Sequence, residues 1–579
     1  MKKIQKNIRQ KINKEITCYE WHSSIVLEGI VDSWDDVVKA GKLAANKGYK
    51  GVVNKIEVKN LSIPDIKKPL LKDNYLHGKK VDVLIIGGGI IGCAIARELS
   101  KWDISILIIE KEEDLAMHTS SRNDGMIHPG ILPKPGTKKA IFNVRGNKLY
   151  SKVTKELDVP FRRIGSLMLF EGNYMKLLLP YIKLRAKQNR VEGIQYLSAD
   201  AIRKRVPAIT KDISGGIFVP TTGILSPYKM TIAYGENAVL NGAEISFNTI
   251  ALSMKKEHES IKAVQTNRGT IYPNLVINAA GVYSDKIAEM AGDQFFTIHP
   301  RKGQTIILDK KKGKLIDIVI AKSSLRKSTR SNTKGGGIVK TIDGNILVGP
   351  DAYEQPYRED YTTTRENIEN IMKKHFPLIP QLSPKDVINY FAGIRAATYE
   401  EDFIVEKSEY VENLIHAAGI QSPGLASAPA IAEEIEKITI NVLNDIQEVK
   451  PKENWNPIRK GIPQLNKMNK YERDRLIKER PDYGIIICRC EEISKGEIID
   501  SIKSPIPAKS IDAIKRRVRP GMGRCQGGFC LPLVSKIIEE ETELDMLSIT
   551  KKGNKSQILS KETKEPDFDN EGGEASGDI

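Results

Sequence analysis

The sequence predicts an α/β protein of several domains, and three observations carry this prediction. A chain of 579 residues is much longer than a single hydrophobic core supports. A strand, a glycine-rich turn, a helix and a second strand follow one another over residues 81–112. Four of the six cysteines lie together near the C-terminal end. We therefore expect a large central α/β domain, preceded and followed by a smaller one.

The composition excludes several classes of protein. Hydrophobic residues make up 40% and charged residues 28% of the chain, which is ordinary for a globular protein. No run of apolar residues is long enough to span a membrane, and the basic N-terminus lacks the apolar stretch of a secretory signal. The net charge of +17 comes from scattered lysines, which favours a solvated surface over a nucleic-acid site. We expect a cytoplasmic protein without a nucleic-acid partner.

Residues 1–61 predict a small α/β domain: a helix Ile4–Ile16, a strand Ser24–Gly29, a helix Trp34–Lys47 and a strand Val52–Val58. The stretch IVLEGIVDSWDDVVKAGKLAANKGYKGVVNKIEV resembles a BON domain. BON domains are associated with phospholipid or ligand binding, so the resemblance implies peripheral contact with a membrane. A plain docking or oligomerisation domain is an equal alternative.

Shifts in composition divide the rest of the chain. A lysine- and proline-rich linker precedes the main domain, a charged bridge follows it, and the last residues are acidic and too poor in apolar side chains to fold. The predicted boundaries are 62–79 for the linker, 80–445 for the main domain, 446–483 for the bridge, 484–545 for the cysteine domain and 546–579 for a disordered tail.

The glycine-rich turn opening the main domain predicts a Rossmann-like dinucleotide site. Gly87, Gly89 and Gly92 form GxGxxG, and seventeen residues separate Gly92 from Glu110 at the end of the second strand. The first glycine permits the tight turn, the second lets the backbone approach a pyrophosphate, and the third allows close helix packing. Glu110 would accept hydrogen bonds from the adenosine ribose. The order of the flanking elements argues against a turn that binds nothing.

Further motifs carry a family resemblance over roughly residues 80–445. HTSSRNDGMIHPG, LVINAAGVYSDKIAEMAG, HPRKGQTIILDK, TIDGNILVGPDA, YFAGIRAAT and HAAGIQSPGLASAPAIAEEI resemble the glycerol-3-phosphate dehydrogenase branch of the D-amino-acid-oxidase-like flavoproteins, most of all its anaerobic type. The resemblance implies bound FAD and an α+β substrate domain inserted into the Rossmann-like part. It also implies that the following residues line the flavin pyrophosphate and ring: Ser120, Ser121, Arg122 and Asn123.

Two later segments have the same pattern of a strand followed by a glycine-containing turn. LVINAAG is a buried parallel strand whose Ala280 and Gly281 would let the chain pass close to the cofactor. Gly419 and Gly424 should lie by the flavin ring and the pyrophosphate. Each turn alone is as readily an ordinary strand-to-helix connection, but together they favour cofactor contact.

Two residues are candidates for the chemistry. His128 lies in the loop matched to the flavin, and an imidazole can accept a proton near neutral pH; alternatively, it only bonds the flavin or the loop. Arg395 matches the family arginine that faces the anionic group of the substrate, which suits a guanidinium fork; a structural ion pair is the alternative.

The substrate stays open in the sequence. Oxidation of sn-glycerol 3-phosphate to dihydroxyacetone phosphate is the leading hypothesis. However, Ile131 and Leu132 stand where several relatives carry an arginine, and the run from Lys134 to Gly136 is shared with 2-hydroxyglutarate oxidases. A 2-hydroxy acid or an amino acid is therefore an alternative substrate, and a non-catalytic electron-transfer subunit is an alternative function.

The clustered cysteines predict a [2Fe-2S] site. Cys488 and Cys490 form C-x-C, and after thirty-four intervening residues Cys525 and Cys530 form C-x4-C. Four thiolates match such a cluster, and neighbouring glycines leave backbone N–H groups free for the sulfurs. Structural zinc is the alternative, although it more often has two C-x2-C pairs. The pattern resembles the bacterioferritin-associated-ferredoxin-like domain, and by analogy with the anaerobic enzymes we expect further electron-transfer subunits as partners.

Overall fold

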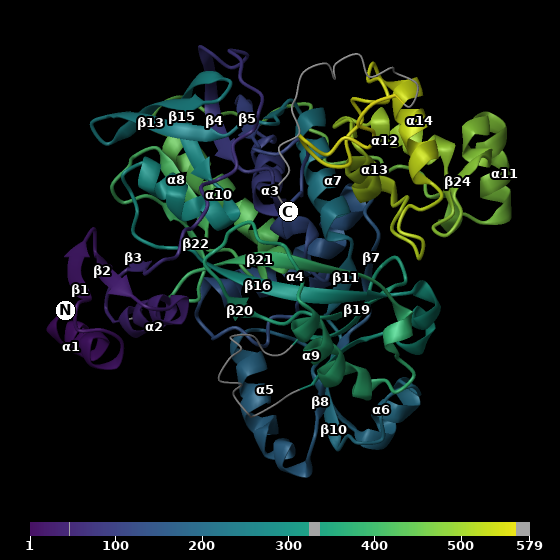
Figure 1. The fold of residues 1–579 in the computed structure, drawn as a ribbon, viewed down its shortest axis with the longest axis horizontal. Helices are drawn as coiled ribbons and strands as arrows, with labels where there is room; N and C mark the ends of the chain where they lie inside the picture. Colours follow the sequence, from purple (N-terminus) through teal and green to yellow (C-terminus); the bar gives the residue numbers. More distant parts are fainter. Residues whose placement is uncertain (46, 323–335, 563–579) are drawn as a thin grey trace, which may run out of the picture. The chain divides into compact units, whose positions relative to one another are not determined.

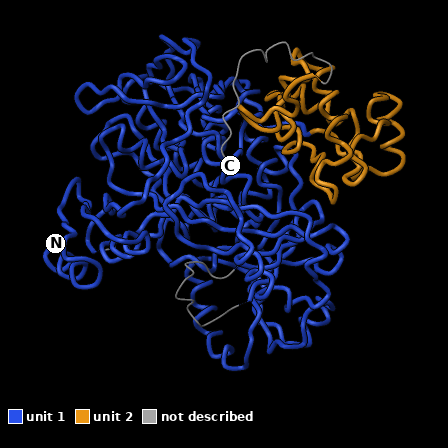
Figure 2. The backbone as a smooth tube through the Cα atoms, in the orientation of Figure 1, with its two compact units in different colours: residues 1–461 blue, residues 462–579 orange. Residues whose placement is uncertain are grey.

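The computed structural model describes residues 1–45, 47–322 and 336–562. The chain divides into two compact units, residues 1–461 and residues 462–579 (Figure 2). This division falls inside the predicted bridge 446–483, so the bridge is shared between the units rather than standing apart. Within the described ranges, no helix is long and apolar enough to cross a membrane.

A parallel sheet in the first unit confirms the predicted Rossmann-like core. Its parallel strands pair in the order β12, β5, β4, β15 and β23, with β4 in the middle (Figure 1). Val83, Leu84 and Ile85 of β4 are completely buried, which explains an apolar run without alternation. The bounds are β4 Lys79–Ile86, β5 Ile106–Ile109, β12 Glu244–Ser246, β15 Gly269–Asn278 and β23 Leu414–Ala418, with antiparallel β13 Ala251–Glu257, β14 Ser260–Thr266 and β22 Ile404–Lys407 added at the edges.

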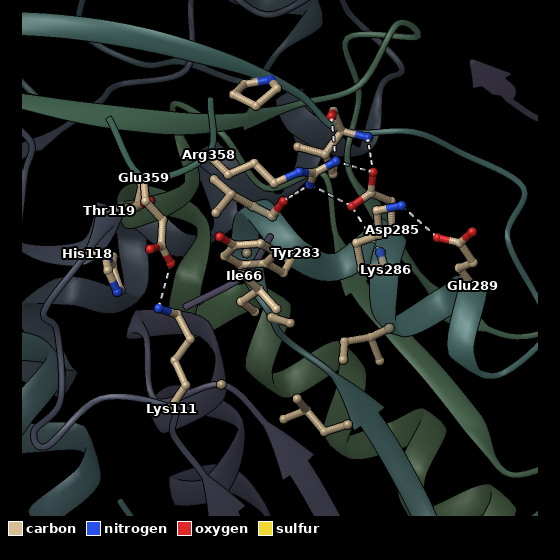
Figure 3. Close-up of a pocket in the computed structure, with 18 of the residues that line it drawn as sticks. Ile66, Lys111, His118, Thr119, Tyr283, Asp285, Lys286, Glu289, Arg358 and Glu359 are labelled. Atoms are coloured by element: carbon tan, nitrogen blue, oxygen red, sulfur yellow. Dashed lines mark hydrogen bonds and ion pairs between the residues drawn. The ribbon is translucent and has the colours of Figure 1, made fainter. Parts of the chain in front are cut away.

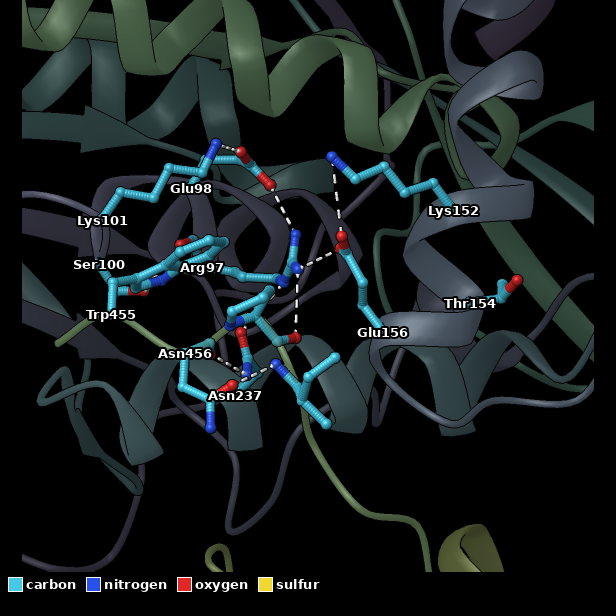
Figure 4. Close-up of polar contacts among 12 residues, drawn as sticks. Arg97, Glu98, Ser100, Lys101, Lys152, Thr154, Glu156, Asn237, Trp455 and Asn456 are labelled. Atoms are coloured by element: carbon cyan, nitrogen blue, oxygen red, sulfur yellow. Dashed lines mark hydrogen bonds and ion pairs between the residues drawn. The ribbon is translucent and has the colours of Figure 1, made fainter.

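A buried arginine joins three of the helices that lie beside this sheet. The helices beside the sheet are α3 (Ile90–Leu99), α4 (Lys138–Glu156), α7 (Pro227–Leu240) and α10 (Gly424–Asn444). Arg97 of α3 is 2% exposed; it donates to Glu156 of α4 at 2.7 Å and to Asn237 of α7 at 3.1 Å (Figure 4). A buried charge is costly unless it is fully paired. The network therefore fixes the helix that follows the glycine turn.

A second, nine-stranded sheet confirms the inserted α+β domain. The chain leaves the Rossmann-like part after β5, returns for α7 to β15, leaves again, and returns for β22, β23 and α10. The strands of the nine-stranded sheet are β8 Ser166–Phe170, β9 Gln195–Ser198, β10 Gly215–Val219, β16 His299–Leu308, β17 Val319–Lys322, β18 Gly337–Lys340, β19 Ile346–Gly349, β20 Tyr353–Glu354 and β21 Val387–Ala397. The remaining elements of the first unit's body are α5 Leu179–Gln188, α6 Ala199–Arg205, α8 Ser284–Met290, α9 Arg365–His375 and the small sheet β6 Met126–Ile127, β11 Gly223–Leu225 and β7 Phe161–Arg163.

The N-terminal domain is α/β, as predicted, but contains an additional strand. Its elements are α1 Lys2–Lys11, β1 Thr17–Trp21, β2 Ser24–Val31, α2 Trp34–Ala44 and β3 Val52–Val58. The helix predicted over Ile4–Ile16 ends at Lys11, and β1 pairs with β2 through a turn in which His22 and Ser23 have positive φ. Neither residue type normally signals such a turn. The membrane contact expected of this domain stays a prediction.

The described part of the second unit contains four α-helices and a short hairpin. They are α11 Lys470–Glu479, α12 Lys495–Ile502, α13 Ile511–Val518 and α14 Leu531–Glu541, with β24 Ile486–Cys488 and β25 Ile493–Ser494. The prediction of a disordered tail over 546–579 is wrong for its first part, because Ile549 is completely buried in the core of this unit and Thr550 bridges to Gln557. Residues 563–579 lie outside the described residues.

Candidate cofactor and active site

The turn between β4 and α3 has the geometry that the glycine fingerprint requires. Gly87 has a φ of +118°, and a Cβ there would lie 2.5 Å from the carbonyl oxygen of Ala279. A Cβ on Gly92 would overlap the carbonyl oxygen of Gly87. Gly89 is the N-cap of α3, so the N–H groups of the first helical turn point toward this loop. A side chain is excluded where a pyrophosphate would approach.

Glu110 and Ser120 lie on either side of this turn. Glu110 follows β5, and its carboxylate accepts hydrogen bonds from the N–H of Gly88 at 2.7 Å and the N–H of Glu112 at 3.0 Å. The hydroxyl of Ser120 accepts from the N–H of Ile90, the first residue of α3, at 2.9 Å. The acid predicted to bind the ribose and the serine predicted to bind the pyrophosphate are thus brought to the fingerprint.

Two adjoining cavities run from this turn through the first unit. The larger has a volume of about 710 Å³ and is lined by Gly87, Gly89, Glu110, Ala280 and Gly281. The smaller, of about 170 Å³, is lined by Arg122, Asn123, His128, Arg395 and Gly424. Five residues line both, namely Gly89, Thr119, Ser120, Ala279 and Gly281. An elongated dinucleotide fits this arrangement, with adenosine beside Glu110 and the ring end toward Arg395.

The larger cavity contains charged pairs that sequence reasoning did not identify. Arg358 bonds both carboxylate oxygens of Asp285 at 2.8 Å, and Lys111 pairs with Glu359 at 2.6 Å (Figure 3). Nε2 of His118 donates to the carboxylate of Glu112 at 2.7 Å. Burial alone would raise the pKa of Glu112, but the charges and hydrogen bonds of His118 and Lys111 outweigh it and lower this pKa to about 2. No local pattern joins these distant segments, so only the fold reveals the pairs.

Arg395 lines the smaller cavity, and one of its two terminal guanidinium nitrogens lacks a partner among the described residues. Its Nη2 donates to the carbonyl oxygen of Asp351 at 3.3 Å, while Nη1 is buried without a hydrogen-bond partner among the described residues. Gly303 lies against the guanidinium, and a Cβ there would come within 2.6 Å of Nη2. Burial, helped by the charge of Arg301, lowers the pKa of Arg395 to about 10, so the group is still a cation at neutral pH. A buried donor without a partner is costly, and an anion would satisfy it.

His128 is held at the edge of the same cavity. Its backbone carbonyl accepts from the side-chain amides of Asn143 and Asn147 of α4, at 2.7 and 3.0 Å. Its ring Nε2 lies 3.5 Å from the hydroxyl of Ser422. The loop position is therefore fixed by two amides, while the imidazole stays at the cavity wall with Arg395.

Of the other residues predicted to contact the cofactor, some line a cavity and others lie in neighbouring loops. The Arg122 guanidinium stacks over the ring of Tyr361 at 4.3 Å, and Asn123 donates to the carbonyls of Thr119 and Ser120, which shapes the loop. Ser121 donates to the carbonyl of His118 and, like Gly419, is not among the described residues that line either cavity. Gly419 instead has a φ of +63° at the turn after β23.

The four predicted cysteines meet in the second unit. The Sγ of Cys490 lies 3.8 Å from that of Cys488 and 3.8 Å from that of Cys525. Cys530 is the N-cap of α14 and hydrogen-bonds Cys488. A Cβ on Gly523 would overlap the Cys490 sulfur, so the loop passes close only because this residue is glycine.

Backbone N–H groups point at these sulfurs, as a [2Fe-2S] site requires. Burial tends to raise the pKa of Cys525, but the N–H groups of Gly527 and Phe529 donate to it and the pKa is lowered. The N–H of Gly521 likewise donates to Cys488. Four thiols with backbone donors fit the cluster, and two irons would each take two of them.

Comparison with known proteins agrees with this geometry. Residues 82–438 match the family described as FAD dependent oxidoreductase, and residues 486–540 match the BFD-like [2Fe-2S] binding domain. Glycerol 3-phosphate dehydrogenase of Caloramator mitchellensis is 40% identical over 484 residues, which cover 83% of this chain and 99% of that protein. The mitochondrial L-2-hydroxyglutarate dehydrogenase of Mus musculus is 28% identical, covering 60% of this chain and 86% of its own.

A solved structure has the same fold. It is dithionite-reduced L-alpha-glycerophosphate oxidase from Mycoplasma pneumoniae with FAD bound, which superposes with a TM-score of 0.61 at 28% identity and covers 66% of this chain and 98% of that one. The four-cysteine segment is matched separately, by the BFD-like [2Fe-2S] binding domain. The chain belongs to the FAD dependent oxidoreductase family and carries a BFD-like [2Fe-2S] binding domain.

Proposed function

We propose that this enzyme is a dehydrogenase that oxidises sn-glycerol 3-phosphate to dihydroxyacetone phosphate and passes the electrons through its [2Fe-2S] cluster. The observation that carries the proposal is Nη1 of Arg395, a buried donor without a hydrogen-bond partner among the described residues, in a cavity that His128 also lines. A phosphate would accept from such a donor, and its charge would be balanced. The similarity to a glycerol 3-phosphate dehydrogenase over 83% of the chain supports the same substrate.

Arg395 and His128 would have different roles in this reaction. Arg395 would hold the phosphate and so orient the C2 carbon, while His128 would take the proton of the C2 hydroxyl as the C2 hydrogen leaves with its electron pair. When bound, FAD supplies the two-electron acceptor and the iron-sulfur cluster a one-electron outlet. The narrow cavity limits water around these groups, which strengthens their electrostatic effect.

The first prediction tests the substrate directly. Adding sn-glycerol 3-phosphate to the anaerobic protein should bleach the flavin absorbance, because the substrate donates two electrons in the absence of an acceptor. Dithionite provides the control that the flavin is reducible. A flavin that dithionite bleaches and sn-glycerol 3-phosphate does not would rule the proposal out.

A 2-hydroxy acid is the second candidate, and one observation favours it. Ile131, which stands where several related enzymes carry an arginine, is 5% exposed and packs in an apolar core, so no second cation comes from this position. The L-2-hydroxyglutarate dehydrogenase of mouse is also similar to this chain. Bleaching by L-2-hydroxyglutarate but not by sn-glycerol 3-phosphate would select this alternative.

The second prediction concerns the base. His128→Asn should lower kcat by about a hundredfold with little change in KM, because an amide fills the site but cannot accept the proton. The acid limb of the kcat pH profile should disappear with it. His258→Asn, which alters an exposed loop residue, is the matched control. An unchanged kcat in H128N would limit His128 to a structural role.

We infer that further electron-transfer subunits take up the electrons. Cys490 is exposed, whereas Cys488 and Cys530 are buried, so the cluster would be reached from the Cys490 side. The side chain of Phe529 is 82% exposed next to Cys530. An exposed aromatic residue of this kind is typical of interfaces, and it supports a docking partner at this face.

A further inference from the structure

The wall of the larger cavity is completed by residues from outside the FAD domain. Gly87, Gly89 and Glu110 of the FAD domain line it. Trp34, Val37 and Lys55 of the N-terminal domain and residues 63–66 of the linker line it as well. Ile66 lines this cavity together with Tyr283 and with both charged pairs, Arg358–Asp285 and Lys111–Glu359 (Figure 3). This end of the site contains Glu110 and lacks His128 and Arg395, so it is the adenosine end.

We propose that residues 63–66 and the adjoining face of the N-terminal domain form part of the FAD site and hold the adenosine half of the cofactor. The inference concerns the cofactor and not the substrate, so it does not depend on the identity of the compound that is oxidised. It gives residues 1–66 a role in a site that the FAD domain would otherwise form alone.

Close contacts hold the N-terminal domain beside the cavity. The N–H of Asn54 donates to the hydroxyl of Thr297 at 3.0 Å, and its side-chain amide donates to the hydroxyl of Tyr399 at 2.9 Å. Tyr399 is 4% exposed and is part of the N-terminal domain's own apolar core. Thr297 and Tyr399 themselves line the cavity. The domain therefore packs against the very residues that form the site.

Two glycines show how tight this packing is. A Cβ on Gly41 would overlap the ring of Tyr399, and a Cβ on Gly51 would overlap the carbonyl oxygen of Phe295. Lys50 lies 4.3 Å from the centre of the Phe295 ring and pairs with Glu406 and Glu409 at 3.0 and 2.8 Å. Backbone contacts of this kind leave little room for the domain to shift, so β3 and the linker that follows it keep their places at the cavity.

Residues 63–66 of the linker contribute to the cavity through their side chains and not through backbone hydrogen bonds. Among the described residues, 63–66 neither donate nor accept a backbone hydrogen bond. Ile63 is 46% exposed although it lines the cavity, and Pro64 and Ile66 add further apolar surface. Ile250, Ile287 and Met290 line the same cavity. A flat, weakly polar group such as an adenine ring suits a space between apolar side chains.

The test compares two double variants of the full chain. Ile63→Ser with Ile66→Ser should raise the Kd of the apoprotein for FAD about tenfold, because partly buried apolar contacts with the adenine are lost. Leu70→Ser with Leu71→Ser alters two exposed leucines of the same linker that do not line the cavity, and should leave this Kd within about twofold. Quenching of flavin fluorescence on titration measures both.

FMN separates this contact from a general loss of structure. FMN lacks the adenosine half, so its affinity should be the same in the I63S/I66S variant and in the unmodified protein. An equal loss of FMN and FAD affinity would overturn the inference, as would an unchanged Kd for FAD. An unchanged Kd together with bleaching by sn-glycerol 3-phosphate would remove this inference and leave the proposed function intact.

Discussion

Arg395→Met is expected to lower kcat/KM for sn-glycerol 3-phosphate by about a thousandfold while the FAD content stays unchanged. Removing one partner of a buried, hydrogen-bonded charge pair costs roughly 2–5 kcal/mol, and Nη1 of Arg395 has no other partner among the described residues to compete with a phosphate. Methionine retains the length of the side chain but has no charge and no donor. Steady-state assays with an artificial electron acceptor measure the effect.

Two further variants make this result specific. Arg395→Lys keeps the charge but loses the fork, so its kcat/KM should lie between those of R395M and the unmodified enzyme. Arg205→Met removes a guanidinium that stacks on Phe218 at 4.1 Å in the same inserted domain and does not line the cavities; it should behave like the unmodified enzyme. If R395M and R205M had the same kcat/KM, Arg395 would be a structural residue.

Cys530→Ser is expected to abolish electron delivery beyond the flavin. With three thiolates left, the two irons of a [2Fe-2S] cluster are not fully ligated, and iron and acid-labile sulfide should fall from about two of each per chain to near zero. Bleaching of the flavin by substrate should persist, since the flavin cavity belongs to residues 1–461. Turnover with a one-electron acceptor that depends on the cluster should be lost.

The matched control for this variant is Cys18→Ser. Cys18 is a half-buried residue of the N-terminal domain, and its replacement should leave both iron and sulfide in place. Metal analysis also distinguishes a [2Fe-2S] cluster from zinc at the four cysteines. A protein with about one zinc and no sulfide would hold a structural tetrahedral site instead. In that case substrate-dependent bleaching of the flavin would still be expected, but the electrons would need another route.

The parts of the site that sequence reasoning identified are those set by local chain geometry. Gly87 and Gly92 are required by steric contact within one strand, turn and helix, and Glu110 follows at the end of the next strand. The four cysteines are similarly readable, since C-x-C and C-x4-C each occupy one turn. In all these cases the residue types are dictated by atoms only a few positions away or by one shared ligand.

The parts that were missed depend on contacts between distant segments. Arg358 and Asp285 are seventy-three residues apart, and no periodicity joins them. The linker was predicted as a plain connection, because only the docking of the N-terminal domain brings Ile63 and Ile66 to the cavity. The strand β1 was missed for a different reason: its turn has His22 and Ser23 at positive φ, where the residue type gives no signal.

The place of β23 in the central sheet affects how the chain can fold during synthesis. β15 pairs with β4 on one side and with β23 on the other, and β23 is formed only by residues 414–418. A ribosome that has made the glycine turn must therefore synthesise more than three hundred further residues before the sheet can close. Parallel pairings of such long range fold slowly and leave strand edges exposed meanwhile. The central sheet beside the flavin site therefore cannot be complete before residue 418 has been synthesised.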